Sequence, residues 1–340
     1  FALSPGRRRA EIAHPASAMP AAWCGRFGRE VKDAFPRFIP MTALASARRF
    51  QDLLAPDVAP SPYDFQTLFA GEGWLARRRS KRRFQLLKKL DPRIRPILRP
   101  EERVFFVTAG TTVSLAEHFF VGWAAYYLNR RALVFTTQRI LLVQIDSRKR
   151  PRDLVSQLRY EQIASVSSTW NGICQVKLHR GLKLKFQGVA RAERKFLHQF
   201  LSDIVQPRTG AETSETNHLE HLCPKCFAVV PGHPPSCSAC GAPFKSAGRA
   251  ALLSAIFPGL GDLYLGHRGF ALLELFGSAF LWFVLVIAPL VAGGVIDEQT
   301  GELLPIDSSY WITVGIVVAL AHTIDATMTH HFARKGHHPA

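Results

Sequence analysis

Two apolar runs meet across a short polar stretch in Leu133-Val-Phe-Thr-Thr-Gln-Arg-Ile-Leu-Leu142. Short runs that are rich in β-branched and aromatic side chains are typical of buried strands. The second run continues to Ile145. Further runs of this kind lie between Glu102 and Gln187, at Val104–Val107, Ile163–Ser168, Ile173–Leu178 and Leu182–Phe186. The sequence therefore predicts a meander of antiparallel strands.

Two tight turns and one helix complete this part of the chain. Asn171-Gly172 and Arg180-Gly181 lie between strand-like runs. Asn-Gly between apolar residues is a strong hairpin signal, because both turn residues tolerate positive φ. From Arg191 to Val205 an apolar residue recurs every four positions, which predicts an amphipathic helix that ends before Pro207.

This region resembles the bacterial pleckstrin-homology (PH) and GRAM-like families. Their Thr-x-x-Arg element at the end of a strand matches Thr136–Arg139, and Tyr160–Val166 is similar to the strand that follows in those families. The resemblance implies a PH-like antiparallel sheet closed by a C-terminal helix over residues 101–206. Residues 113–128 are bulkier than the families lead us to expect. They fit either a helix packed across the sheet or a dip into the membrane interface.

Four of the six cysteines form two close pairs, Cys223-Pro-Lys-Cys226 and Cys237-Ser-Ala-Cys240. Two thiolates three residues apart can bind one metal ion from a single turn, and the gap between the pairs lets the second turn complete a tetrahedron, as zinc prefers. The segment also resembles short zinc ribbons of bacterial membrane-associated proteins. We expect residues 222–246 to be a ribbon with structural Zn²⁺, because four thiolates leave no open position for catalysis.

Two apolar stretches after Arg249 are long enough to cross a bilayer, Leu275–Ile296 and Tyr310–Thr329. Basic residues flank the pair and acidic residues lie between the two stretches. The basic residues are Arg249 and Arg268 before the first stretch and Arg334 and Lys335 after the second. Since positive residues stay in the cytosol, the pattern predicts a multi-pass protein of the bacterial inner membrane with both termini cytosolic. The cytosol would also keep the cysteines reduced.

A glycine-rich motif precedes the first apolar stretch, in Pro258-Gly-Leu-Gly-Asp-Leu-Tyr-Leu-Gly266. It resembles the Pro-Gly-x-Gly-x-x-Tyr-x-Gly motif that opens a family of small two-helix bacterial membrane domains, which implies such a domain over residues 250–340. The motif residues are Pro258, Gly259, Gly261, Tyr264 and Gly266. The sequence leaves open whether Ala250–Gly266 spans, re-enters or lies on the membrane.

Ionisable residues at membrane depth are functional candidates. Asp262, Glu274 and Asp325 lie in or beside the apolar region, and His322 shares a helical face with Asp325. Asp262, His322 and Asp325 are therefore candidates for an ion path or an intramembrane enzyme. The alternative is that these residues lie at helix ends or pair helices.

Charge indicates an anionic partner. The 340 residues carry 43 Lys and Arg against 26 Asp and Glu, a formal net charge of +17, which suits nucleic acid or an anionic membrane surface. Residues 41–100 form a basic helical segment in which Arg77–Lys89 contains eight basic residues and no acid. Its apolar stripe fits packing on the next domain, and the alternative is that the helix contacts a membrane surface or nucleic acid. Residues 1–40 are expected to be disordered or foreign to the natural protein, and residues 207–221 to be a linker.

A basic cluster follows the strand-like run that ends at Ile145, and it consists of Arg148, Lys149, Arg150 and Arg152. The PH-like resemblance implies that such an inter-strand loop binds anionic headgroups, although a solvated loop is the alternative. We therefore expect an α+β multidomain protein with a PH-like sheet, a zinc ribbon and an all-α transmembrane region. It would be a non-enzymatic, membrane-anchored binding or scaffold protein for anionic lipid or a cytosolic protein. Nucleic-acid binding is less favoured, since the ribbon has few basic residues.

Overall fold

The computed structural model describes residues 61–69, 73–122, 124–169, 173–179, 181–190, 193–194, 197–198, 200–201, 219–296 and 301–340. The predictions for residues 1–40 and for the Asn171-Gly172 turn lie outside these residues. So do most of the helix predicted from Arg191 to Val205 and most of the predicted linker. In the described residues the chain is an α+β protein with antiparallel sheets and a C-terminal helical region.

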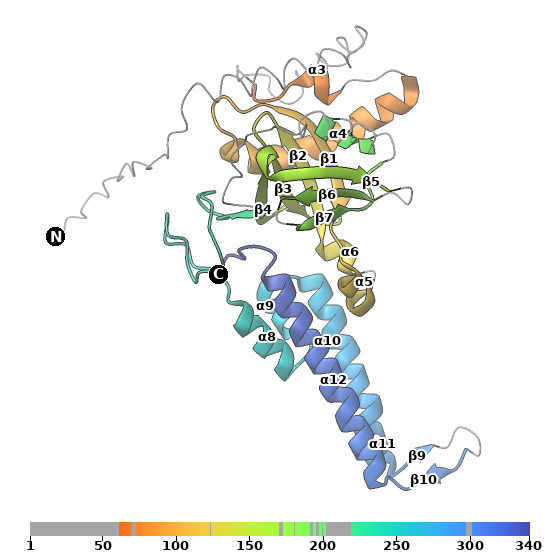
Figure 1. Cartoon of the computed structure of the whole chain (residues 1–340). Helices are drawn as coiled ribbons and strands as arrows, with labels where there is room; N and C mark the ends of the chain where they lie inside the picture. The colour runs from red at the N-terminus through yellow and green to blue at the C-terminus, as the bar shows by residue number, and fades with distance from the viewer. Residues whose placement is uncertain are drawn as a thin grey trace, which may run out of the picture. The chain divides into compact units, whose positions relative to one another are not determined.

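Two antiparallel sheets form a β-domain (Figure 1). The strand order is β1-β2-β3-β4-β8 in one sheet and β5-β6-β7 in the other. The strands are β1 Val104–Thr111, β2 Arg130–Thr136, β3 Arg139–Ile145, β4 Pro151–Arg159, β5 Ile163–Ser168, β6 Cys174–Leu178, β7 Lys183–Phe186 and β8 Glu220–Leu222. In the β2–β3 hairpin Leu133 pairs with Leu142 and Phe135 with Ile140, as the two apolar runs predict.

Two of these strands differ from the sequence-based expectation. Arg152, predicted in a loop, lies in β4, and Glu220 and His221, predicted in the linker, lie in β8, which pairs with β4. Both strands contain polar residues at buried positions, so the sequence does not show the apolar pattern of a strand. In β4, Ser156 and Gln157 are buried although they are polar. Their side chains are hydrogen-bonded to His221 Nδ1 and Glu220 Oε2 respectively, so the two strands satisfy each other.

A long helix covers one face of the five-stranded sheet. It is α4, Gly73–Ile94, preceded by the short α3, Phe65–Leu68, and followed by the 3₁₀ turn η3, Arg95–Ile97. The apolar stripe of α4 is buried in the core of the β-domain, and it consists of Leu86, Leu87, Leu90 and Ile94. The packing role expected for this basic helix is thus confirmed for its apolar side. The opposite sheet face carries an aromatic cluster in which the Phe105 and Phe200 ring centres are 4.7 Å apart.

A helical insertion separates β1 from β2. It consists of α5, Leu115–Val121, and α6, Ala124–Leu128. Ser114 and Glu117 form a capping box that fixes the start of α5. Phe119 is 81% exposed, and Phe120 and Tyr127 are also exposed. In the bulky segment at 113–128, these three aromatic side chains therefore lie on the outside and are not packed across the sheet.

Two helices are long and apolar enough to cross a membrane, Arg268–Ala292 and Ser308–Ala333. The first consists of α10, Arg268–Trp282, the π-helical turn η5, Phe283–Ile287, and α11, Ala288–Ala292; the second is α12. They lie side by side (Figure 1), with the Tyr310 hydroxyl donating to Leu285 O at 2.7 Å. Apolar side chains cover their surfaces: Phe276 is 73% and Val291 is 83% exposed. Such a contiguous apolar surface indicates a membrane or a partner.

The ends of the helices differ from the predicted spans. The first helix begins at Arg268 rather than Leu275 and ends at Ala292, because Gly293 adopts positive φ and β9, Val295–Ile296, pairs with β10, Leu303–Leu304. The second begins at Ser308, where the Asp307 carboxylate accepts a hydrogen bond from Tyr310 N. Before them, α8, Ala247–Ile256, and α9, Leu260–Leu265, pack together. Ten residues of α8 extend about 15 Å, half of a bilayer core of about 30 Å. α8 by itself is therefore too short to cross a bilayer.

Candidate functional site

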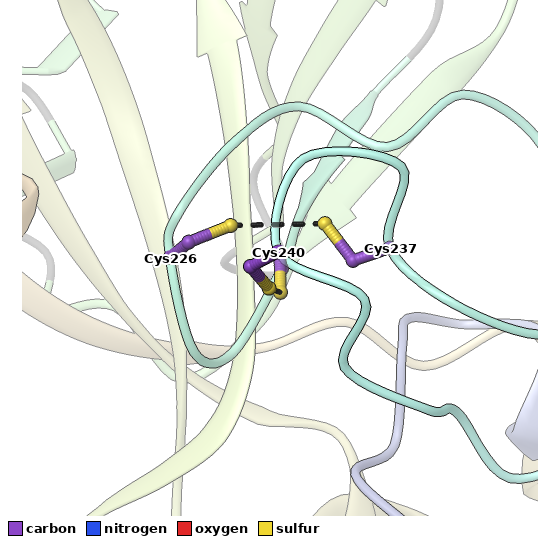
Figure 2. A group of neighbouring side chains, drawn as sticks. Cys226, Cys237 and Cys240 are labelled. Atoms are coloured by element: carbon purple, nitrogen blue, oxygen red, sulfur yellow. Dashed lines mark hydrogen bonds between the residues drawn. The ribbon is translucent and has the colours of Figure 1, made fainter. Parts of the chain in front are cut away.

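The four cysteines of the ribbon converge on one point. The Sγ atoms of Cys223 and Cys240 are 3.7 Å apart, as are those of Cys226 and Cys237, and all four sulfurs lie within 4.8 Å of one another. Figure 2 shows three of these side chains turned toward a common centre. None of the four is in a disulfide. The group could therefore hold one metal ion, as the spacing predicts.

Each cysteine pair lies on a turn of the same construction. Phe227 N donates to Cys223 O at 3.0 Å, and Gly241 N donates to Cys237 O at 2.8 Å. Phe227 and Gly241, the residues that follow the second cysteine of each pair, both have positive φ. Glycine adopts this conformation without cost, whereas Phe227 does not. Gly241 indicates the positive φ of its turn in the sequence. Phe227 has the same conformation in the other turn, but a phenylalanine does not predict it.

The last described residues pack on the ribbon. Lys245 N donates to His338 O at 2.9 Å, and the His337 ring stacks on Phe244 with centres 4.6 Å apart. His337 and His338 are buried. Burial lowers the pKa of both imidazoles, to about 3 for His338. These two histidines are buried packing groups between the ribbon and the end of α12.

The basic cluster after β3 divides between two cavities. Arg148, Arg150 and Arg152 line a cavity of about 450 Å³, together with Tyr127 of the α5–α6 insertion and with Phe270 and Leu273 of α10. We call this the interfacial cavity. Lys149 does not line it and lines a second cavity, beside α4. The structure thus brings three of the four predicted cations to the beginning of the first apolar helix.

The loop that carries these cations is fixed by hydrogen bonds. Asp146 Oδ1 accepts from Arg150 N at 2.8 Å, and Asp146 O accepts from Lys149 N at 2.9 Å. Lys89 of α4 donates to Arg148 O at 2.7 Å. The backbone of the loop is therefore ordered by its neighbours, while Arg148 and Arg150 remain exposed.

The glycine-rich motif packs the C-terminal helices together. A Cβ on Gly261 would lie 2.2 Å from Ala250 O and 2.7 Å from Thr329 Cγ2, so only glycine lets α9 approach both α8 and α12. Gly259 has a φ of +90° and donates to Asp325 Oδ2 at 3.1 Å, directly after Pro258. Gly266 ends α9 with a φ of +95°. The motif residues therefore act at a helical turn and in close helix packing.

The Tyr264 side chain lies among the residues that connect the ribbon to the C-terminal helices. Its hydroxyl accepts a hydrogen bond from Ser246 N at 3.3 Å. Lys245 Nζ and Arg249 Cζ lie 5.6 and 5.7 Å from the centre of its ring. An aromatic ring with cations over it is typical of the polar boundary of a membrane.

Three carboxyl groups come together beside this turn, those of Asp262, Glu274 and Asp325, within 4.8 Å of one another. Asp262 accepts from Thr329 Oγ1 at 3.0 Å and lies 2.7 Å from His267 Nδ1. His322 is not part of the group; its Nδ1 lies 2.8 Å from Ala255 O. These hydrogen bonds give Asp262 and Asp325 roles in helix pairing. The three acids that the sequence singles out therefore lie together, and His322 is not among them.

The Thr-x-x-Arg element is part of a buried polar network. Arg139 donates to both carboxylate oxygens of Glu102, from Nε at 2.9 Å and Nη2 at 2.8 Å, and also to Ile97 O. Thr136 Oγ1 donates to Glu102 Oε1 at 2.6 Å. Burial alone would raise the pKa of Glu102, but Arg139 outweighs it and the pKa is lowered. The element therefore joins the β2–β3 hairpin to η3 and to Glu102, which follow α4.

A second acidic residue links the α5–α6 insertion to the end of α12. Glu117 is 1% exposed, forms an ion pair with Lys335, and has His331 Nε2 at 2.9 Å from its Oε1. Burial would raise the pKa of Glu117, but the hydrogen bond with His331 and the charge of Lys335 hold it at about 2. Among the described residues, this contact ties the β-domain directly to the end of the second apolar helix. Its only sequence signal is the Ser114–Glu117 capping pattern.

Comparison with known proteins finds no matching family model, no similar curated protein and no similar solved structure.

Proposed function

We propose that the chain is a membrane-anchored binding module whose β-domain binds anionic lipid on the cytosolic face of a bacterial inner membrane. The interfacial cavity is the observation that carries this proposal. It combines three arginines from the β-domain with Phe270 and Leu273, which belong to the first turns of an apolar helix. The cations suit the anionic headgroup of a phospholipid, and the apolar side chains suit its acyl chains.

The position of the cavity along the helix gives the lipid its orientation. Because α10 begins at Arg268, Phe270 and Leu273 would lie at headgroup depth, and the arginines beside them would meet phosphate. Cations near an anionic surface are each worth about 1 kcal/mol. The membrane helices hold the β-domain at the bilayer, which raises the local lipid concentration, so a weak site would be occupied.

The exposed aromatic residues of the α5–α6 insertion support the same placement. Glu117 ties α5 to His331 and Lys335 at the end of α12. Phe119 and Phe120 lie in the next half-turn and remain exposed. Aromatic side chains are favoured at the bilayer interface. In this proposal the insertion dips into the headgroup layer, the second of the two alternatives that its sequence allows.

Orientation and fold family are also parts of the proposal. Arg249, Arg268, Arg334 and Lys335 lie at the helix ends nearest the β-domain, and the positive-inside rule puts that side in the cytosol. Two antiparallel sheets followed by helical residues such as Leu197 and Leu201 fit the PH-like plan. The Thr136–Arg139 element, which suggested that plan, has a buried structural role here.

We propose that the metal of the ribbon is Zn²⁺. A tetrahedral site with metal–sulfur bonds of about 2.3 Å has sulfur–sulfur edges of about 3.8 Å. The two measured edges are 3.7 Å. Soft thiolate ligands in a closed tetrahedron favour zinc over magnesium or calcium. Such a site is structural, since four thiolates leave no position for water or substrate.

The lipid proposal is tested with the full chain in nanodiscs that hold equal amounts of phosphatidylglycerol and phosphatidylcholine. Native mass spectrometry would identify the lipids that the extracted protein retains. We expect preferential retention of phosphatidylglycerol, and at least a tenfold loss of that preference in Arg148→Gln/Arg150→Gln/Arg152→Gln. Three cations at about 1 kcal/mol each could give more than a tenfold loss of this preference. Because the arginines are exposed to solvent, each contributes less than that.

The matched control removes three cations elsewhere, in Lys81→Gln/Lys88→Gln/Arg103→Gln. These side chains are exposed and do not line the interfacial cavity. Equal loss in the control would mean that net charge, and not the cavity, selects lipid. No preference in the unmodified protein would contradict the proposal. Preference that duplex DNA abolishes would instead favour the nucleic-acid alternative.

A further inference from the structure

We propose that a second cavity of the β-domain binds a ligand that carries two or more phosphate groups. This cavity has a volume of about 260 Å³, just below the range of about 300–1,000 Å³ for small-molecule sites. It is lined by residues of α4, of β1 and of the start of β2, among others, and we call it the α4 cavity. Its lining is distinct from that of the interfacial cavity, so the inference is independent of the lipid site.

The α4 cavity has an uncompensated positive charge. Five cations and one carboxylate line it: Arg79, Arg82, Arg83, Arg130, Lys149 and Glu193. Glu193 already serves Arg83, whose Nη2 donates to it at 3.0 Å, and it accepts from Thr108 Oγ1 at 2.7 Å. Among the described residues, none forms an ion pair with the other four cations. Four positive charges thus face one cavity without a counter-ion from these parts of the chain.

Three further observations point to an anion in this place. Lys149 has a φ of +60°, a conformation that side chains other than glycine rarely adopt and that concentrates at ligand sites. Burial lowers the pKa of Lys149, and the nearby charges of Arg130, Arg82 and Lys89 lower it further. Arg83 Nε is buried and has no hydrogen-bond partner among the described residues. A bound anion would relieve this crowding of like charges.

The composition of the lining indicates the chemical class. Guanidinium groups bind phosphate through paired N–H donors, and three guanidinium groups with a lysine can surround more than one phosphate. Thr108 and Thr111 place hydroxyl groups at the same cavity. A free polyphosphate and the phosphorylated headgroup of a lipid share this chemistry.

The test is isothermal titration calorimetry of the zinc-loaded full chain in phosphatidylcholine nanodiscs. The probes are inorganic phosphate, pyrophosphate and inositol hexakisphosphate. We expect saturable one-to-one binding that tightens in that order and weakens with salt. Arg82→Gln/Lys149→Gln should lose at least tenfold in affinity for the hexakisphosphate. Arg82→Gln alone should lose less affinity than the double variant. Arg82 is exposed, so its replacement leaves the fold intact.

Lys81→Gln/Lys88→Gln is the matched control, because it removes two exposed cations of the same helix that do not line the α4 cavity. Its affinity should change less than twofold, and the triple interfacial variant should also keep its binding. No saturable binding, or an equal loss in the control, would overturn the proposal. Nanodiscs that contain phosphatidylinositol bisphosphate distinguish the two ligand sources. If this lipid competes with the hexakisphosphate, the cavity binds a lipid headgroup. If it does not compete, the cavity binds a soluble polyphosphate.

Discussion

Removal of the metal is expected to unfold the ribbon while the β-domain stays folded. The buried core of the ribbon consists of Cys223, Val230, Cys237 and Phe244, two of which are ligands. A segment of this size cannot fold on so small a core. Structural zinc sites contribute apparent free energies of about 10–16 kcal/mol, most of which is folding free energy. Hydrogen exchange of the full chain before and after chelation measures the effect.

The loss of protection should have a defined extent. Amides of residues 223–244 should exchange freely, and so should those of 337–340, because His338 O and Ala340 N pair with the ribbon. Amides of β1 to β3 should keep their protection. Cys226→Ser should reproduce the effect of chelation, whereas Cys174→Ala, outside the metal group, should not. Full protection of residues 223–244 in protein shown to be metal-free would contradict a metal-dependent fold.

Arg139→Met is expected to destabilise the β-domain by roughly 3–5 kcal/mol, because it leaves the Glu102 carboxylate buried without its partner. Glu102 is 1% exposed, and Arg139 donates two hydrogen bonds to it. For a domain of this size, that loss corresponds to a fall in Tm on the order of 10 °C. Differential scanning fluorimetry of the full chain, with Arg103→Gln as an exposed control, measures it.

Two further comparisons separate the pair from simple packing. Glu102→Leu/Arg139→Met should recover much of the lost stability, because it removes both charges together. The pKa of Glu102 is lowered in the fold. The stability that its ionised form provides is therefore present above the unfolded pKa, near 4.3, and is lost as pH falls through the folded pKa. The deficit of Arg139→Met should shrink in acid. A double variant less stable than Arg139→Met would contradict this account.

The sequence predicts those features that local patterns encode. The Leu133–Leu142 run predicts the β2–β3 hairpin, because every residue of its two apolar runs is buried. Cysteine spacing predicts the metal group, because each pair needs only one tight turn. The strands β4 and β8 are missed, since Ser156 and Gln157 are buried by virtue of partners that lie more than 60 residues away.

Local patterns in the sequence do not predict sites whose residues come from distant segments of the chain. The sequence presents Arg148, Lys149, Arg150 and Arg152 as one basic cluster, whereas the fold assigns Lys149 to the α4 cavity and the three arginines to the interfacial cavity. Glu117 and Lys335 are 218 residues apart in the sequence, and they form an ion pair because α5 packs near the end of α12. Apolar spans were recognised by composition, but their ends depend on caps such as Asp307 and on Gly293.

The most direct test of the lipid-binding account is a photo-crosslink at Ser147, which is exposed and lines the interfacial cavity. Benzoylphenylalanine at this position would be activated in nanodiscs with equal phosphatidylglycerol and phosphatidylcholine, with Leu182, an exposed apolar residue elsewhere on the β-domain, as the control position. The account predicts lipid adducts at position 147 that are enriched in phosphatidylglycerol, and few at position 182. Absence of lipid adducts at 147, or adducts in the bulk lipid ratio, would contradict it.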